Sequence, residues 1–153
     1  MNFRLNKFMI KYKIKILMIN LTILVFFILD RFLKKLALKG FSTKFFILEK
    51  NLFLIFKLSL PPLLVSILII IILFVLFLFL FRAYQKKAPF FIFSFSLIIL
   101  GALNNLIDWI FYSYIIDYVA LPFLPIFNLG DLMIVGGIGM LVKKILKSDE
   151  LEI

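Results

Sequence analysis

The residues best suited to chemistry lie in two near-copies of one short pattern. Residues 105–108 read Asn-Leu-Ile-Asp and residues 128–131 read Asn-Leu-Gly-Asp, with a third acid, Asp117, between them. Their surroundings are strongly apolar, because 65% of the chain is hydrophobic. Carboxylates near hydrocarbon are costly, so they normally face a bundle interior or a wet cavity and mark function. An Asn and an Asp three residues apart lie on one helical face, so each pair can point together.

Two carboxylates held close together favour acid–base catalysis. They do not both ionise easily, so they tend to share one proton, which makes one a base and the other an acid, as in aspartic proteases. The chain has no Cys and no His, which excludes thiol nucleophiles, disulfides, zinc sites with Cys or His ligands, and Ser-His-Asp triads. We expect no metal and no cofactor.

Other interpretations of the same acids remain open at this point. Asp108 or Asp131 could cap a helix, pair with Lys34 or Arg31, or contact lipid headgroups. Acids within a membrane also occur in ion or proton paths. Three acids and two Asn residues in one short stretch favour a functional site over the structural roles, and an ion or proton path stays open as a second functional interpretation.

The apolar runs predict an all-α integral membrane protein with one domain, residues 1–153. Each run is close to the roughly 20 residues that cross a bilayer. The four expected spans are approximately 14–35, 61–81, 89–112 and 127–146. A small platform on the outer face, possibly β, is expected between the first and second spans, because residues 40–57 are rich in Phe and aliphatic residues. Gly101 and Ala102, and then Gly136, Gly137 and Gly139, are expected to permit close helix packing.

Basic residues predict the orientation of this bundle. The net charge is +10, and the Lys and Arg residues gather before the first span, between the second and third, and after the fourth. This pattern is a topology signal and not a nucleic-acid surface. We expect both termini in the cytoplasm and segments 36–58 and 113–126 outside. Asp30, Asp108, Asp117 and Asp131 then all lie towards the outer membrane face.

These stretches together resemble signal peptidase II, the bacterial lipoprotein signal peptidase family. Its members have four spans with an Asp-Gln-x-x-Lys pattern, a Gly-Asn-x-x-Asp-Arg segment, a Val-Val-Asp segment and a Phe-Asn-x-Ala-Asp segment. The matching stretches here begin at Asp30, Asn104, Ile115 and Phe127. The sequence departs from the family pattern at four positions, where Arg31, Asn104, Trp109 and Gly130 replace Gln, Gly, Arg and Ala.

The resemblance implies roles for named residues. Asp117 and Asp131 would be the catalytic pair, and the remaining candidates would support the site or contact the substrate. These supporting residues are Asn105, Asp108, Asn128, Asp30, Lys34 and Asn51.

The resemblance also implies the activity. We expect an intramembrane aspartyl endopeptidase that removes signal peptides from diacylglyceryl-modified prolipoproteins by cleaving before the lipidated Cys. It would be a monomer surrounded by phospholipid in the bacterial cytoplasmic membrane, with no nucleic-acid partner. The alternatives are a non-catalytic membrane protein that binds lipidated signal helices, or a small ion or proton conductor.

Overall fold

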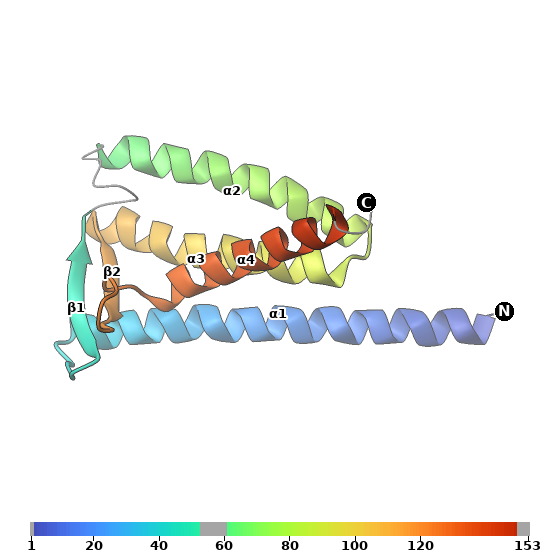
Figure 1. Ribbon diagram of the computed structural model, residues 1–153, viewed down its shortest axis with the longest axis horizontal. Coiled ribbons are helices and arrows are strands. Elements are labelled where there is room, and N and C mark those ends of the chain that lie inside the picture. The colour runs from blue at the N-terminus through green and yellow to red at the C-terminus, as the bar shows by residue number, and fades with distance from the viewer. Residues whose placement is uncertain (1, 53–60, 150–153) are drawn as a thin grey trace.

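Four helices and a two-stranded sheet make up the computed structural model, which describes residues 2–52 and 61–149 (Figure 1). The predicted fold class, an all-α membrane bundle with a small platform, is confirmed. In chain order the elements are α1 (Asn2–Leu38), β1 (Phe46–Asn51), α2 (Pro62–Gln85), α3 (Pro89–Tyr112), β2 (Ile115–Val119) and α4 (Leu129–Asp149).

Three helices of the described chain are long and apolar enough to cross a membrane. These segments are Met9–Leu38, Ser66–Gln85 and Pro89–Tyr112. Their outward faces carry large apolar side chains, such as Phe74 and Phe77 on α2, which are 65% and 60% exposed. Such faces are costly in water and suit contact with lipid. The fourth predicted span coincides with α4, which carries Asp131, Lys143 and Lys144 and is more charged; the division into four spans within one domain stays a prediction.

Local sequence explains where several helices begin and end. Proline occupies the first positions of α2 and α3, where its fixed φ suits the helix and its missing N–H costs little. Helix α3 ends at Ser113, which adopts the left-handed conformation with φ 60° and donates its N–H to the Trp109 carbonyl. This cap turns the chain back into β2 within two residues.

Helix α3 is the centre of the bundle and packs against α1, α2 and α4. Two glycines allow the close approach of α3 and α4. A Cβ on Gly101 would lie 2.5 Å from the Gly130 carbonyl oxygen, and a Cβ on Gly137 would lie 2.6 Å from Ile98 Cγ1. The prediction was wrong for Gly136 and Gly139, where an added Cβ would meet nothing within 4 Å. Those two glycines face away from the neighbouring helix.

The platform is an antiparallel pair of strands at one end of the bundle (Figure 1). Glu49 of β1 lies opposite Asp117 of β2, and the register is irregular between Phe46 and Glu49. The sequence predicted a platform only from the segment between the first and second spans; half of the sheet in fact comes from the segment after α3. The same end of the molecule receives the last turns of α1 and α3 and the first turn of α4 (Figure 1).

Candidate active site

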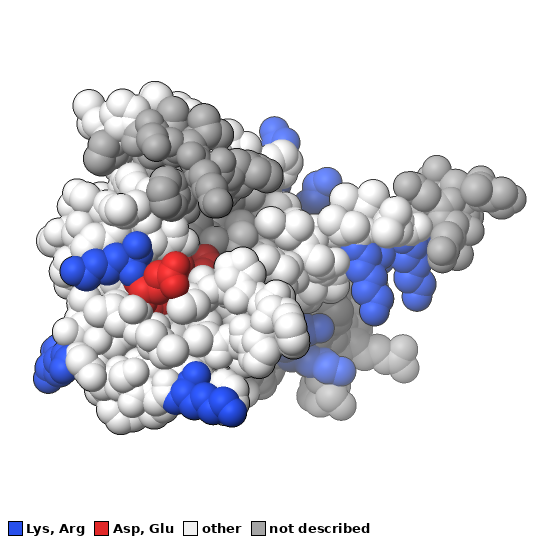
Figure 2. All heavy atoms as spheres, turned by 60° about the vertical axis from the view of Figure 1, so that its left-hand side comes forward, with Lys and Arg blue, Asp and Glu red and all other residues white. Residues whose placement is uncertain are grey.

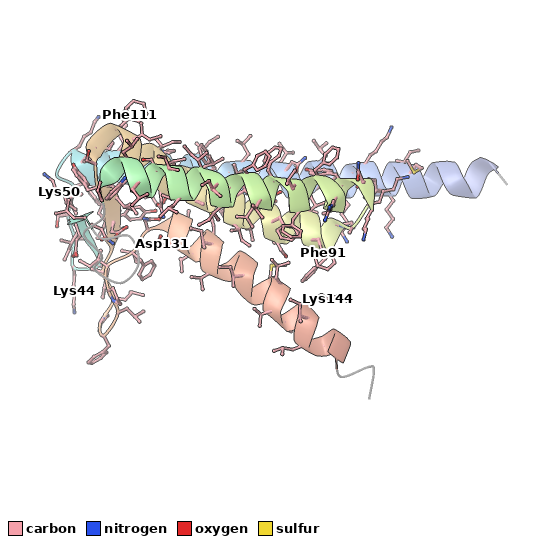
Figure 3. All side chains as sticks on the ribbon, turned by 90° about the horizontal axis from the view of Figure 1, so that it is seen from above. Lys44, Lys50, Phe91, Phe111, Asp131 and Lys144 are labelled. Carbon is pink, nitrogen blue, oxygen red and sulfur yellow. The ribbon has the colours of Figure 1, made fainter. Side chains whose placement is uncertain are left out.

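All the predicted site residues come together at the end of the bundle that carries the sheet. Figure 2, which brings this end forward, shows a small group of acidic atoms on one face, beside a basic side chain and otherwise surrounded by uncharged ones. Figure 3 places Asp131 at the sheet end of α4, with Lys144 far along the same helix. The contributing side chains are Asp30 and Lys34 of α1, Asn51 of β1, Asn105 and Asp108 of α3, Asp117 of β2, and Asn128 and Asp131 at the start of α4.

Asn128 and Asp131 form a reciprocal cap at the first turn of α4. The Asn128 side chain accepts a hydrogen bond at Oδ1 from the Asp131 backbone N–H, at 3.0 Å, and the Asn128 backbone N–H donates to Asp131 Oδ2, at 3.1 Å. This is a capping box, in which each side chain satisfies a backbone donor that the helix cannot. The cap holds the Asp131 carboxylate at a fixed place on the helix end.

Asp117 accepts hydrogen bonds from two amide side chains. Asn51 Nδ2 donates to Asp117 Oδ2 at 2.8 Å, and Asn128 Nδ2 donates to Asp117 Oδ1 at 2.6 Å. Only 1% of Asp117 is exposed. Burial raises the pKa of Asp117 to about 6, against the lowering effect of the Asn51 hydrogen bond, and the negative charge of Asp131 raises this pKa further. A proton therefore remains on Asp117 at pH values where an ordinary Asp is ionised.

Asn105 connects Asp131 to a buried cation. Its Nδ2 donates to Asp131 Oδ1 at 2.8 Å, and its Oδ1 accepts from Lys34 Nζ at 2.9 Å. Because Lys34 can only donate, it fixes which end of the Asn105 amide faces Asp131. Asn105 and Asp108 do not bond to each other, so the first copy of the Asn-x-x-Asp pattern behaves differently from the second.

Asp108 belongs to a buried ionic cluster behind the acid pair. Lys34 Nζ lies 2.7 Å from Asp108 Oδ2 and 3.1 Å from Asp30 Oδ2. Arg31 Nη1 lies 2.7 Å from Asp108 Oδ1 and also donates to the Asn104 carbonyl at 2.9 Å. Asp108 is therefore an ion-pair partner of both Lys34 and Arg31, as the alternative interpretation of this acid expected.

Tyr118 is a site neighbour that the sequence analysis missed. Its hydroxyl donates to Asp30 Oδ1 at 2.9 Å and accepts from the Leu129 backbone N–H at 3.1 Å. Successive side chains on a strand point to opposite faces, so Tyr118 points away from the side on which Asp117 lies. That alternation is the only sequence signal for it, and it requires knowing that Ile115–Val119 is a strand.

Both acids line one cavity of about 390 Å³. Its walls come from both strands, α2, α3, α4 and the segment before α4. Asn51, Asn105, Asp117 and Asp131 supply its polar groups. Its apolar lining residues are Ile69, Ile72, Leu73, Ala102, Ile115, Pro125, Ile126, Phe127 and Ile134. A mostly apolar cavity with a few convergent polar groups is typical of a binding site for an apolar ligand.

The donor set does not indicate a metal centre. Within the described residues, no three His, Cys, Asp or Glu side chains are grouped so that they could hold a metal ion. Asp117 and Asp131 instead accept hydrogen bonds from amide groups. The arrangement therefore offers a pair of acids and amide donors towards whatever occupies the cavity.

Solved structures with the same fold are bacterial membrane enzymes. One superposes with a TM-score of 0.73 at 22% identity, covering 86% of this chain and 89% of that one. A second gives a TM-score of 0.70 at 21% identity over 85% of this chain and 93% of its own.

Similar sequences are lipoprotein signal peptidases. The protein from Buchnera aphidicola subsp. Schizaphis graminum is 35% identical over 130 residues, which are 78% of this chain and 72% of the relative. The protein from Caldicellulosiruptor bescii is 39% identical over 67 residues, and that from Syntrophomonas wolfei is 48% identical over 59 residues. These two alignments span 45% and 40% of the relatives' lengths, and 44% and 38% of this chain. The profile of the family described as Signal peptidase (SPase) II matches residues 22–147, and this chain belongs to that family.

Proposed function

We propose that the protein is an aspartic endopeptidase that removes signal peptides from diacylglyceryl-modified prolipoproteins by cleaving before the lipidated Cys. The observation that carries the proposal is the pair Asp117 and Asp131, which line one cavity and are each held by two hydrogen-bond donors. Membership of the signal peptidase II family supports the substrate class.

The acid pair divides the chemistry between a base and an acid. Near pH 6 Asp117 holds a proton beside the negative charge of Asp131. Asp131 then removes a proton from a water molecule while Asp117 donates its proton to the oxygen of the scissile carbonyl. The resulting tetrahedral intermediate collapses as the proton taken by Asp131 passes to the departing amine nitrogen, the C–N bond breaks, and one hydroxyl proton of the intermediate returns to Asp117. No group other than two carboxyls, water and the peptide is needed for this balance.

The supporting residues act through these two acids. Asn51 and Asn128 hold the Asp117 carboxyl, and Asn105 holds Asp131 in an orientation set by Lys34. Asp30 and Asp108 keep Lys34 in place by ion pairing. Their substitution should disturb geometry and stability, whereas substitution of Asp117 or Asp131 removes the reacting group itself.

The cavity suits a substrate that arrives through the membrane. It lies between α2 on one side and α4 on the other, with α3 contributing Ala102 and Asn105 between them. Its α2 wall consists of Ile69, Ile72 and Leu73, which match an apolar signal helix or a diacylglyceryl chain. The protein would lie as a monomer among phospholipids in the bacterial cytoplasmic membrane, with both termini cytoplasmic and the sheet end near the outer face.

Conservative substitutions of the two acids test the proposal. Asp117→Asn and Asp131→Asn retain the size of the side chain and one of its two acceptor oxygens, and each should abolish cleavage of a diacylglyceryl-modified precursor in proteoliposomes. Glu49→Gln is the matched control, because Glu49 is an exposed acid directly opposite Asp117 in the sheet register, and it should cleave at the wild-type rate. Near-normal turnover by either Asn variant would refute the assignment. Precursor binding by a wild-type protein that never cleaves would instead indicate a non-catalytic binding protein.

A further inference from the structure

The backbone N–H groups in the first turn of α4 donate hydrogen bonds to acceptors from three different parts of the chain. The Leu129 N–H donates to the Tyr118 hydroxyl at 3.1 Å, and the Gly130 N–H donates to Asp30 Oδ1 at 3.3 Å. The Asp131 N–H donates to the capping side chain of Asn128. These are the backbone donors that a helix leaves without partners of its own. The helix end that carries Asp131 is therefore fixed by β2 and α1 as well as by its own cap.

Tyr118 connects β2, which carries Asp117, to the start of α4, which carries Asp131. Its hydroxyl bonds both to Leu129 and to Asp30 Oδ1, at 2.9 Å for the latter. Asp30 Oδ1 in turn accepts from Gly130, so the three groups close a small ring of hydrogen bonds. Tyr118 follows Asp117 directly in β2, and Leu129 precedes Asp131 by two residues. Asp117 is therefore linked to Asp131 through the neighbouring Tyr118, its hydrogen bond to Leu129, and the backbone from Leu129 to Asp131.

We propose that the Tyr118 hydroxyl is a positioning group, which sets the first turn of α4, and with it Asp131, at the correct distance from Asp117. The inference rests on the proposed function, because it assigns Tyr118 a part in the reaction of that acid pair. Tyr118 does not line the cavity, so it acts through the backbone of α4 and not on the substrate.

The hydroxyl can be separated from the ring in an experiment. The Tyr118 ring is 1% exposed, packs at 5.2 Å from the Phe46 ring, and belongs to an apolar cluster with Ala37 and Ile116. Phenylalanine would preserve this packing and remove only the oxygen. The Leu129 N–H would then lose its acceptor in a partly buried place, and an unpaired donor there costs free energy.

Burial also keeps the hydroxyl in its donating form. Burial raises the pKa of Tyr118, and the negative charge of Asp30 raises it further. The hydroxyl therefore stays protonated at neutral pH. The Tyr118 hydroxyl therefore remains the donor to Asp30, as a positioning role requires.

Tyr118→Phe tests the proposal, with Tyr84→Phe as the matched control. Tyr84 also donates its hydroxyl to another helix, to Asn20 Oδ1 at 3.0 Å, but at the end of the bundle remote from the sheet. We expect Tyr118→Phe to lower kcat for precursor cleavage about tenfold to a hundredfold, as small displacements of reacting groups do, with KM changed by less than about twofold. Tyr84→Phe should leave both constants near wild type.

Amide hydrogen exchange gives a readout that needs no activity. In Tyr118→Phe the Leu129 and Gly130 amides should exchange faster, while amides in the middle of α4 keep their wild-type rates. All proteins are compared well below their melting temperatures, so that a stability change does not mimic a positional one.

The outcomes distinguish the two proposals. A wild-type protein that does not cleave overturns the proposed function, and a Tyr118→Phe protein with wild-type kcat, or with unchanged Leu129 exchange, overturns the positioning role. A uniform rise in exchange along α4, or a rate loss that appears wholly in KM, also overturns it, because either result indicates general loosening or altered substrate binding.

Discussion

Replacing Lys34 by methionine should be the most damaging single change in the supporting cluster. Lys34 is fully buried, and its ammonium contacts Asp108, Asp30 and Asn105 at 2.7, 3.1 and 2.9 Å. Two acids and two cations form the cluster, so it is neutral as a whole. Lys34→Met keeps the length of the side chain and leaves one uncompensated negative charge in the protein interior.

The expected cost follows from that unpaired charge. Removing one partner of a buried ion pair destabilises proteins by about 3–5 kcal/mol, since the other charge stays buried. Arg31→Met is the matched comparison, because the Arg31 side chain is 25% exposed and Asp108 would keep both Lys34 and the Ile116 N–H. Its cost should be about 1–2 kcal/mol, because solvent screens the partly exposed pair.

Cleavage should separate the two variants as well. Lys34→Met frees the Asn105 amide, which can then turn its oxygen towards Asp131, so kcat should fall by at least about tenfold, the equivalent of one lost hydrogen bond of about 1.4 kcal/mol. Arg31 instead bonds to the Asn104 carbonyl and to Asp108, so Arg31→Met should retain most of the wild-type kcat. Unfolding in detergent micelles and cleavage of a diacylglyceryl-modified precursor measure the two effects. Equal losses of stability and kcat in the two variants would refute this account of Lys34.

Two further predictions concern the acid pair and the helix contact. The kcat/KM of the wild-type protein should fall as pH rises through about 6, because Asp117 loses the proton it donates. Asn51→Ala removes a hydrogen bond that lowers the pKa of Asp117, so the midpoint of the fall should move to higher pH. A midpoint that stays or moves to lower pH would contradict this prediction. Gly137→Ala should lower the free energy of unfolding by about 1–3 kcal/mol, because its Cβ would meet Ile98 at 2.6 Å. Gly136→Ala, which meets nothing within 4 Å, should be neutral or stabilising by up to about 1 kcal/mol, and similar melting temperatures for the two variants would show that the helices do not pack this closely.

The helices could be predicted from the sequence because their apolar runs are long and their ends are marked locally. Pro62 and Pro89 open two helices close to the predicted boundaries. The sheet was only half predicted. Its second strand, Ile115–Val119, is five residues long and pairs with a strand more than 60 residues earlier, and nothing in a short apolar segment identifies a partner that far away.

The topology inferred from the sequence also predicted that the acids gather at one end of the bundle. It did not predict which hydrogen-bond or ion-pair partner each acid has. Spacing places Asn and Asp of each pattern on one helical face, yet only Asn128 and Asp131 bond to each other. Their pair lies at a helix start, where backbone donors need acceptors. Asn105 and Asp108 lie near the end of α3, where the backbone N–H groups of the helix are already used. Their oxygens accept instead from the cations of α1 and, for Asp108, also from the Ile116 N–H.

A single physical difference separates the acids proposed to react from those proposed to support. Asp30 and Asp108 are buried beside cations at 3.1 Å or less, and these ion pairs hold their carboxylates in the cluster. Asp117 is equally buried but is held by two neutral amides, which stabilise its charge less than a cation does. Its pKa is therefore raised to about 6, mainly by burial, with Asp131 adding to the effect. Asp117, which amides hold, can therefore keep and give a proton. The ionic cluster is connected to the acid pair through Asn105, which bonds both Lys34 and Asp131.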